Sequence, residues 1–573
     1  MATKEQFDAV WTNGKWLDVA PRPFLVDYSG LRVRKSAVAA LVGQAGHRPL
    51  VLIFAAVVFL FMLFVPVPPS LSAMLVAENP PGYGTMGPAT NTIVESVNYH
   101  KNPQAFLDWQ QNGNTGESSA GLDSSDKVAR LALLMVGILL VAAILWGSEA
   151  LPIGGTVALV AVLMLAFDVL PSDEIAKAFL NDAVFFILGL LAVAVGVSKT
   201  GLDKRIGLLL LSHIKSPWSF AMIFLPVISV CSAFLSAHAL VALLVPVIMG
   251  VYKASCKSNG VEKDRALAIF LFLGVSFAAN IGGPGSPAAG ARNAIMVGFF
   301  ADSGYAIGFF EWMKYGLPLV PLWALTVGSY MYLRCKPHFL VKTVNPSEVV
   351  KREVAKLPRF GGNEAVMAII LGSLVVGWMT LQNSLGMGGV TLTAVFAMFL
   401  LKVVAWDDIQ SGVAFDVVGL YAAASAIAVG LSFTGGGLWL ANEAVAVLPG
   451  FMSEGTGLVM GVTVMTGTLT NFMSDGATVS VLGPLVLPMA ELGNVSVWKI
   501  GLAVSFASSL ANVLVVGTPN NAIVFAMSKD PDTGKKLLSV LDFVKYGLPL
   551  TLLLLIVMWG WALFGYWTIL SWP

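Results

Sequence analysis

The sequence predicts an all-α polytopic membrane protein built from an inverted repeat. The chain is 57% hydrophobic and only 12% charged, whereas soluble domains average about 25% charged residues. Apolar windows near the length that crosses a bilayer recur along the 573 residues. The second half of the chain also repeats the first. Together these observations predict about 11 transmembrane helices, two re-entrant hairpins and two broken helices.

Composition excludes several other classes. An outer-membrane barrel would show short alternating segments instead. The net charge of +1 implies no general attraction to nucleic acid. The three scattered cysteines, Cys231, Cys256 and Cys335, support neither a disulfide framework nor a metal site. No nucleophile–base pair or metal-ligand cluster stands at a catalytic spacing, so we expect no enzyme and no cofactor.

The chain divides into six segments in order. The first 49 residues are polar and basic, without a cleavable signal peptide, so the first apolar window reads as an uncleaved helix. The insert after it is rich in Gly, Asn, Ser and Pro, and is either a small ordered cap or a flexible loop. The expected segments are a cytoplasmic N-terminus (1–49), a first transmembrane helix (50–68), an external insert (69–127), a first repeat (128–335), a cytoplasmic linker (336–363) and a second repeat (364–573).

Lysine and arginine indicate the orientation, because cytoplasmic segments carry an excess of both. Basic residues gather in 1–49, 199–215, 253–265, 334–359 and 529–545. The 68–127 stretch holds only Lys101 and Lys127, and 403–498 holds none. We therefore expect a plasma-membrane protein with a cytoplasmic N-terminus and an external C-terminus.

The repeat is visible in matched stretches. "DAVFFILGLLAVAVGVSKTG" at 182–201 aligns with "DVVGLYAAASAIAVGLSFTG" at 416–435, and "SAHALVALLVP" at 236–246 aligns with "SDGATVSVLGP" at 474–484. "KYGLPL" occurs at both 314–319 and 545–550. The charge pattern places the two copies on opposite sides of the membrane. Such inverted repeats are typical of secondary transporters, whose site lies at the repeat interface.

Short segments in each repeat predict the hairpins. Trp218–Val230 and Ala239–Gly250 are too short to cross a bilayer, and their copies are Leu458–Met465 and Val479–Met489. Helix breakers follow in "NIGGPGSPAAGARN" at 280–293 and "NVLVVGTPNN" at 512–521. Non-helical backbone at membrane depth is tolerated only where it is buried in protein or lines a cavity. Freed helix N-termini attract anions and freed carbonyls attract cations, so we expect a site for both.

Three loops resemble those of the divalent anion:sodium symporters, which carry dicarboxylates, citrate or sulfate. "LWGSEALPI" at 145–153 is similar to the family's Trp-x-Thr-Glu-Ala-x-Pro stretch. "GTPNNAIVFA" at 517–526 resembles its Thr-Pro-Pro-Asn-Ala loop, and "IGGPGSPAAGARNAI" at 281–295 its first broken loop. The resemblance runs from about residue 128 to the end. It implies a homodimer in the lipid bilayer, an elevator motion, a small anionic substrate between the hairpin tips and one sodium ion at each tip.

Carried onto this chain, the resemblance implies two sets of residues. We expect the substrate to be bound by Ser236, His238, Arg292, Ser474, Gly476, Thr478, Thr518 and Pro519. We expect coupling cations to be bound by Ser232, Ser236, Gly283, Asn293, Ser474, Asp475 and Asn521.

Three of these residues depart from the family pattern, whose tips read Ser-Asn-Thr. Arg292 stands where the family has a proline; it either replaces a sodium ion or grips an anion bidentately, or else it snorkels or is structurally paired. Asp475 could ligate sodium, carry a proton, or pair with Arg292. His238 either donates to the anion when protonated or only packs.

The lead hypothesis is a secondary active transporter of a dicarboxylate, sulfate or related oxyanion, coupled to Na⁺ or H⁺. One alternative is a cation/proton antiporter or arsenite-type carrier, which "SDGATVSVLGP" vaguely resembles. Another is an anion-binding, transporter-like sensor or channel without coupled flux, for which the 69–127 insert could serve a partner.

Overall fold

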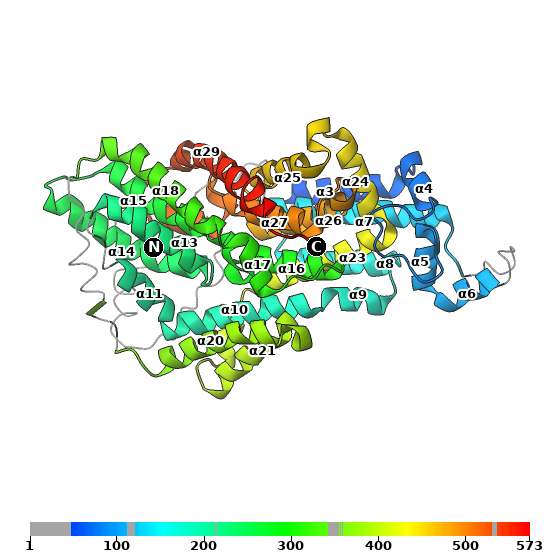
Figure 1. The fold of residues 1–573 in the computed structure, drawn as a ribbon, viewed down its shortest axis with the longest axis horizontal. Helices are drawn as coiled ribbons and strands as arrows, with labels where there is room; N and C mark the ends of the chain where they lie inside the picture. The colour runs from blue at the N-terminus through cyan, green and yellow to red at the C-terminus, as the bar shows by residue number, and fades with distance from the viewer. Residues whose placement is uncertain are drawn as a thin grey trace.

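The protein is helical throughout its described part. The structure, a computed structural model, describes residues 47–573 apart from 112–120, 212–213, 215, 342–353, 356, 358, 530–533 and 535. Within these ranges β-type backbone pairing is limited to isolated bridges, such as that of Lys529 with Lys536, and no strand is formed. Figure 1 shows the helices gathered into one body, with a pair of helices along its lower edge. Nearly all of the segment expected at 1–49, and half of the one expected at 336–363, lie outside the described residues.

The first half of the chain contains the helices that lead to and form the first hairpin and the first broken helix. After the peripheral helices come, in order, α7 (Ser125–Ser148), α8 (Ile153–Ala166), α9 (Ser172–Phe179), α10 (Asp182–Thr200), α11 (Leu202–Leu211), α12 (Pro217–Ser219), η3 (Phe220–Phe224), α13 (Leu225–Ser232), α14 (Ala237–Ser258), α15 (Arg265–Asn280), η4 (Gly283–Gly285), η5 (Pro287–Ala289), α16 (Ala291–Asp302), α17 (Phe309–Gly316), α18 (Leu319–Cys335) and η6 (Lys336–His338).

The second half follows the same order of elements. It contains α20 (Asn363–Thr380), α21 (Gln382–Leu400), α22 (Trp406–Gly412), α23 (Phe415–Thr434), α24 (Gly436–Val447), η7 (Gly450–Met452), α25 (Gly455–Leu469), α26 (Asp475–Leu492), α27 (Val497–Ala507), η8 (Ser508–Leu510), η9 (Val515–Gly517), α28 (Pro519–Met527), α29 (Val540–Val557), η10 (Met558–Leu563) and η11 (Tyr566–Thr568). Each half thus has a hairpin followed by a helix that is broken in the middle.

Matching details at helix ends confirm the repeat. Helices α10 and α23 both end at a glycine in the left-handed region, Gly201 with φ 77° and Gly435 with φ 74°. Only glycine enters that region without steric cost, which explains why both copies end in Gly. Helices α14 and α26 both begin after a serine, Ser236 or Ser474, whose hydroxyl accepts a hydrogen bond from the backbone N–H three residues on.

The described helices fit a multi-pass membrane protein. Eight are long and apolar enough to cross a bilayer, and two bent pairs raise the number to ten. The bent pairs are Pro49–Phe64 with Pro69–Leu75, and Phe309–Gly316 with Leu319–His338. Four shorter apolar helices are also present, Ile153–Ala166, Pro217–Ser232, Gly455–Leu469 and Val497–Leu510. Some of these helices belong to the hairpins and broken helices, so the set is compatible with about eleven spans plus hairpins.

The hairpin arms are longer than the sequence pattern indicates. The predicted second arm ends at Gly250, but α14 continues to Ser258 and runs through Pro246. The arms of the second hairpin, α25 and α26, likewise exceed the predicted ranges, and α26 contains two prolines. The predicted arms covered only the apolar windows, and the helices continue past them into polar residues such as Lys253 and Asp475. In a packed bundle, neighbouring groups can satisfy the carbonyls that proline leaves free.

The segment after the first helix is an ordered cap in its described part. Helices α5 (Ile93–Lys101) and α6 (Pro103–Gln111) lie at the right-hand end of Figure 1, beside α4 (Pro69–Leu75). Lys101 bonds Asp123 at 3.1 Å, and the hydroxyl of Tyr83 donates to the carbonyl oxygen of Phe433 at 2.9 Å. The cap is therefore fastened both to itself and to the end of α23.

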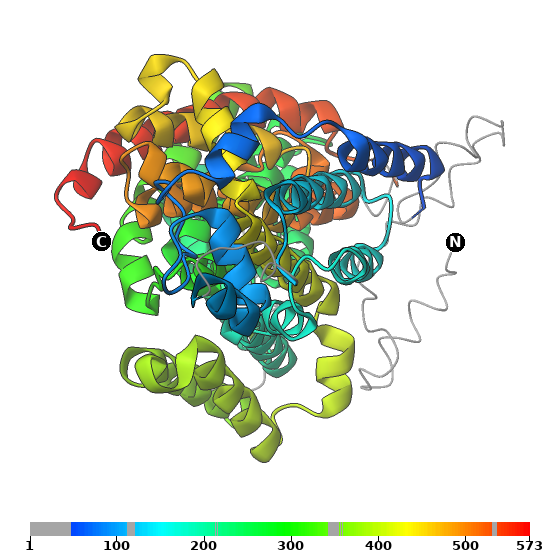
Figure 2. The same cartoon turned by 90° about the vertical axis from the view of Figure 1, so that its right-hand side faces the viewer.

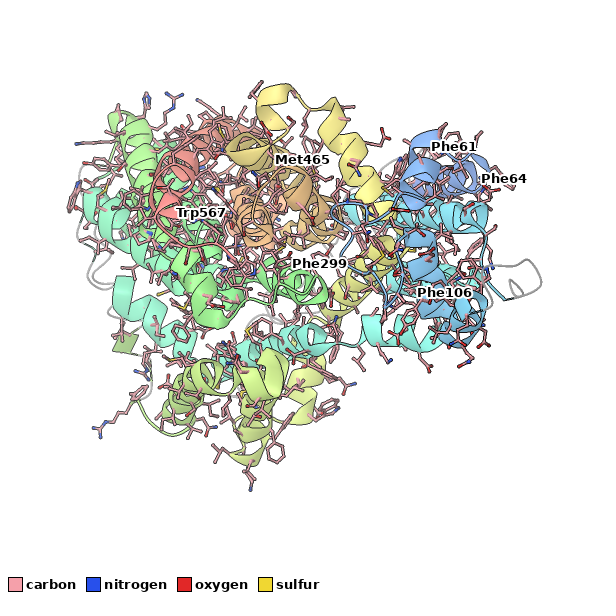
Figure 3. All side chains as sticks on the ribbon, turned by 45° about the vertical axis from the view of Figure 1, so that its right-hand side comes forward. Phe61, Phe64, Phe106, Phe299, Met465 and Trp567 are labelled. Carbon is pink, nitrogen blue, oxygen red and sulfur yellow. The ribbon has the colours of Figure 1, made fainter. Side chains whose placement is uncertain are left out.

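Exposed and buried aromatic side chains separate the surface from the core. On helix α3 (Pro49–Phe64), Phe61 and Phe64 are 63% and 75% exposed and project from the edge of the bundle (Figure 3). Phe299 and Trp567 are almost fully buried. Helices α20 and α21 also carry exposed apolar side chains, such as Ile369 and Phe396. The two helices lie apart from the main body in Figure 2 and pack on α10. Such apolar exposure fits helices that face lipid.

The repeated "KYGLPL" has a structural reason. A Cβ on Gly316 would stand 1.9 Å from the carbonyl oxygen of Pro284, and one on Gly547 would stand 2.1 Å from that of Asn512. Both carbonyls belong to the break of the broken helix in the same repeat, Pro284 within the 3₁₀ turn η4 and Asn512 between η8 and η9. In each copy, therefore, a glycine lets a helix lie directly against the break.

We expect Gly316→Ala and Gly547→Ala each to lower stability by about 1–3 kcal/mol, the usual range for overpacking a close contact. Thermal unfolding of the purified protein in detergent would measure the loss. Gly372→Ala is the matched control, because no atom lies within 4 Å of its Cβ position on α20. Equal midpoints for all three variants would contradict the close approach.

Candidate functional site

The first hairpin tip lies between α13 and α14. Ser236 caps α14, and the hydroxyl of Ser232 donates to the carbonyl oxygen of Ser229 at 2.9 Å, within its own helix. His238, in the first turn of α14, contacts Asn520 across the repeat boundary, with Nδ1 at 2.7 Å from Oδ1. The Asn520 amide nitrogen is already used, since it donates to Asn280 at 2.9 Å. His238 therefore donates from Nδ1, which leaves Nε2 without a partner among the described residues.

The second hairpin tip lies between α25 and α26. Ser474 caps α26, and Thr478 uses its hydroxyl to donate to the carbonyl oxygen of Ser474 at 3.0 Å. Asp475 is the first residue of α26; one carboxylate oxygen accepts from the backbone N–H of Gly476 at 2.8 Å. Its other oxygen accepts from Nη1 of Arg292, so the two charges form an ion pair.

The two tips make equivalent contacts with different chemistry. Arg292 and Asn520 occupy corresponding positions, each directly before the paired residues Asn293 and Asn521. Helix α14 packs on α28 and helix α26 packs on α16, so each hairpin touches the broken helix of the other repeat. At the first tip this contact is the His238–Asn520 hydrogen bond. At the second tip it is an ion pair.

Asn293 holds the first break together. Its amide nitrogen donates to the carbonyl oxygens of Gly283 and Ser286 at 2.6 and 2.7 Å. Its Oδ1 accepts from the hydroxyl of Ser505, on α27 of the second repeat, at 2.7 Å. Asn293 is 0% exposed, and both its amide nitrogen and its Oδ1 are used in these hydrogen bonds.

Asn521 does the same for the second break. Its amide nitrogen donates to the carbonyl oxygens of Ala511 and Leu514 at 2.8 and 2.9 Å. Its Oδ1 accepts from the hydroxyl of Ser276, on α15 of the first repeat, at 2.7 Å. Each repeat therefore gives the other the same hydrogen bond, which is the mark of an approximate two-fold relation.

Asn280 connects the two halves of the site. Its amide nitrogen contacts Oδ1 of Asn512 at 3.1 Å and Oδ1 of Asn521 at 3.2 Å, and its Oδ1 accepts from Asn520. Its backbone carbonyl lies 3.5 Å from Nη2 of Arg292. A continuous set of polar contacts thus runs from His238 at one tip to Asp475 at the other.

The ends of four helices set the electrostatics of this region. Helices α14, α16, α26 and α28 begin at the two tips and after the two breaks. Helix N-termini carry partial positive charge and unpaired N–H groups, and so favour anions. Arg292 adds a full positive charge that is only 7% exposed. Asp475 is the single carboxylate that it contacts in the described structure.

The surroundings of Arg292 contain unused donors. Three buried polar atoms here have no hydrogen-bond partner within the described residues: Nε of Arg292, Oγ of Ser509 and Nδ2 of Asn512. A Cβ on Gly283 would stand 2.0 Å from Nη2 of Arg292 and 2.3 Å from Oγ of Ser509, so these groups are neighbours across Gly283. Buried polar groups are normally paired, so this set leaves hydrogen-bonding capacity that a ligand or water could satisfy.

The structure brings together only part of the predicted site. Arg292 meets Asp475, as one of the three interpretations of Asp475 expects. Ser236 and Ser474 serve as caps, and Ser232, Asn293 and Asn521 make hydrogen bonds inside the fold. Gly476 is buried beside the tip, Thr518 precedes α28 in an extended conformation, and Pro519 is its first residue. Their roles in binding stay predictions.

Sequence reasoning missed Asn280, Asn512, Asn520 and Ser509. Asn280 and Asn512 begin the two quoted broken stretches, and that equivalence was a usable signal. Asn520 corresponds to Arg292 in the repeat, which pointed to it in the same way. Nothing in the sequence distinguished Ser509 from its neighbouring serine. No group of three or more His, Cys, Asp or Glu side chains that could hold a metal ion occurs among the residues described.

We expect the Arg292–Asp475 pair to show strong energetic coupling. Breaking a buried pair leaves a charge unpaired and costs about 3–5 kcal/mol, and less here because 17% of the Asp475 side chain is exposed. Arg292→Gln and Asp475→Asn should therefore each lower thermal stability, and the double variant should lose less than the sum.

The matched control is Glu174→Gln, which removes an ion pair to Lys177 whose side chains are 51% and 71% exposed. It should change stability by less than about 1 kcal/mol. Additive losses in the Arg292/Asp475 cycle, measured by unfolding in detergent, would show that the pair is not coupled.

Comparison with known proteins agrees with this architecture. A family model described as the sodium:sulfate symporter transmembrane region matches residues 122–572. Sodium-dependent high-affinity dicarboxylate transporter 3 of Caenorhabditis elegans is 27% identical over 472 residues, covering 73% of this chain and 80% of that protein. The sodium-dependent dicarboxylate transporter SdcS of Staphylococcus saprophyticus is 23% identical over 437 residues, covering 70% and 82%.

Among solved structures, MtrF of Neisseria gonorrhoeae, described with a class of antimetabolite efflux pumps, has a TM-score of 0.51 at 15% identity. It covers 84% of this chain and 98% of its own, and this likeness concerns the fold alone. The family model spans most of the chain, including both hairpins and both broken helices. The protein therefore belongs to the sodium:sulfate symporter family of multi-pass membrane transporters.

Proposed function

We propose that the protein is a secondary active transporter that carries a small dianion, a dicarboxylate or sulfate, together with Na⁺. The observation that carries the proposal is the buried Arg292 among four helix N-termini at the interface of the two repeats. Relatives named as sodium-dependent dicarboxylate transporters support both the substrate class and the coupling ion.

The anion lies between the two tips in this proposal. Arg292 supplies charge and a planar donor fork that suits carboxylate and sulfate oxygens. At the other tip, Nε2 of His238 can also bind the anion, because it donates a hydrogen bond when the imidazole is protonated. A dianion with two separated charged ends could contact both.

Cations would bind to oxygen atoms near the tips, because hard cations prefer oxygen ligands. The Oδ1 atoms of Asn293 and Asn521 are already hydrogen-bonded to serines, so we assign these two residues to holding the breaks. Asp475, the tip serines and the carbonyl oxygens of the tips are the ligands that we propose for Na⁺ as co-substrate.

The proposed protein works as a homodimer in the plasma membrane, with a cytoplasmic N-terminus and an external C-terminus. The orientation follows from the distribution of Lys and Arg. Hairpins and broken helices of both repeats move together past the remaining helices, which is an elevator motion. The reciprocal Ser276–Asn521 and Ser505–Asn293 bonds support this, because they tie both broken helices into one unit.

Uptake into proteoliposomes tests the proposal. We expect labelled succinate or sulfate to accumulate under an inward Na⁺ gradient, and to accumulate less when choline replaces Na⁺. A pH gradient alone should not replace the Na⁺ gradient. If no anion of a panel of dicarboxylates and oxyanions moves under either gradient, the proposed function is wrong. Binding without counterflow would indicate a sensor instead.

We expect His238→Ala to raise KM for the transported anion by about tenfold, the effect of losing one charge-assisted hydrogen bond of about 1.5 kcal/mol. The maximal rate should change less. His338→Ala is the control, since His338 is exposed on η6, away from both tips. An unchanged KM in the His238 variant would assign this histidine to packing with Asn520 alone.

A further inference from the structure

We propose that Asp475 occupies the anion subsite of Arg292 when no substrate is bound, and that an incoming carboxylate or sulfate displaces it. The inference rests on the proposed function and deepens it. It assigns Asp475 as an internal competitor of the substrate, and Arg292 and Ser509 as the subsite for one charged end of the anion.

The way in which Arg292 is used supports this assignment. Only Nη1 donates to Asp475, Nη2 has a long 3.5 Å contact with the carbonyl oxygen of Asn280, and Nε has no partner within the described part of the chain. A guanidinium binds carboxylates best through two parallel N–H donors. The pair with Asp475 therefore leaves much of the binding capacity of this guanidinium unused.

A neighbouring donor extends the same subsite. The hydroxyl of Ser509 is 1% exposed at the residue level and has no hydrogen-bond partner in the part described. Gly283 lies against both groups, since a Cβ there would stand 2.0 Å from Nη2 of Arg292 and 2.3 Å from the Ser509 hydroxyl, which places the two donors side by side. An oxyanion held by Arg292 could accept from Ser509 with a second oxygen, which would pair two atoms that are now unpaired.

An exchange of Asp475 for the incoming anion leaves neither charge unpaired, because Arg292 gains the anion and Asp475 gains a new positive partner. Its side chain is 17% exposed, compared with 8% for Arg292, so it lies on the more accessible side of the pair. Among the described residues, its carboxylate otherwise contacts only the N–H of Gly476 at the start of α26, where the helix dipole favours negative charge. After displacement the carboxylate needs a new positive partner, and a cation arriving with the anion provides one.

The first tip shows why only one tip works in this way. There the equivalent contact joins His238 and Asn520, so that tip holds no carboxylate to displace. Substrate binding at the first tip therefore adds hydrogen bonds, whereas binding at the second tip exchanges one anion for another. The exchange makes anion affinity depend on the cation that receives Asp475.

Anion binding to the purified full-length protein in detergent tests the exchange. Affinity for succinate and for sulfate would be measured by titration calorimetry and by thermal shift, in choline chloride and in sodium chloride. For the parent protein we expect weak binding without Na⁺ and at least about tenfold tighter binding with it, a change of about 1.4 kcal/mol. Asp475→Asn should bind at least about tenfold more tightly than the parent without Na⁺ and should lose the dependence on Na⁺.

Two further variants complete the test. Glu443→Gln, an exposed carboxylate on α24, should behave like the parent. Ser509→Ala should weaken anion binding several-fold with little change in the unfolding temperature of the anion-free protein. This variant decides the matter if Asp475→Asn does not fold, and an unchanged affinity for Ser509→Ala overturns the proposed subsite.

The outcomes separate this inference from the proposed function. If Asp475→Asn keeps the affinity and the Na⁺ dependence of the parent, Asp475 is not an internal competitor, while anion transport stands. If neither the parent nor any variant binds a dicarboxylate or sulfate, the proposed function fails and the exchange fails with it.

Discussion

The main constraint on this fold is the hydrogen bonding of two helix breaks inside a helical bundle. Away from water, each free N–H and C=O group must find a partner in the protein. Asn293 and Asn521 meet that need, since each amide nitrogen donates to two carbonyl oxygens of its own break. Each amide oxygen then accepts from a serine of the other repeat. The same two side chains therefore stabilise the non-helical backbone of the breaks and join the two repeats.

This arrangement explains how a nearly symmetric frame can hold an asymmetric site. The two hairpin tips make corresponding contacts, but one is His238 with Asn520 and the other is Asp475 with Arg292. A full positive charge beside helix N-termini would be costly if nothing neutralised it. The carboxylate of Asp475 neutralises it in the described state. The Arg292–Asp475 ion pair is thus supported by the uncharged asparagine and serine hydrogen bonds that both repeats share.

The resemblance to known transport loops predicted the fold and pointed to the tips and breaks as the region of the site. It predicted less about which side chains contact one another, and the structure explains why. Apolar windows and the repeat indicated the helices, because both are periodic along the chain. The full lengths of α14 and α26 were missed, because the predicted arms covered only the apolar windows and the helices continue beyond them into polar residues. Asn280 was missed as the connecting residue, since its four side-chain contacts all come from the other repeat.

The sequence by itself determined the membrane class, the repeat, the breaks and the presence of two unusual charges at conspicuous positions. Local pattern and composition carry that information. The tertiary structure alone decided which residues meet. It packs a hairpin arm of each repeat on the broken helix of the other repeat, α14 on α28 and α26 on α16. Arg292 and Asp475 are 183 positions apart, and only the folding of two repeats around one approximate two-fold axis brings them into contact.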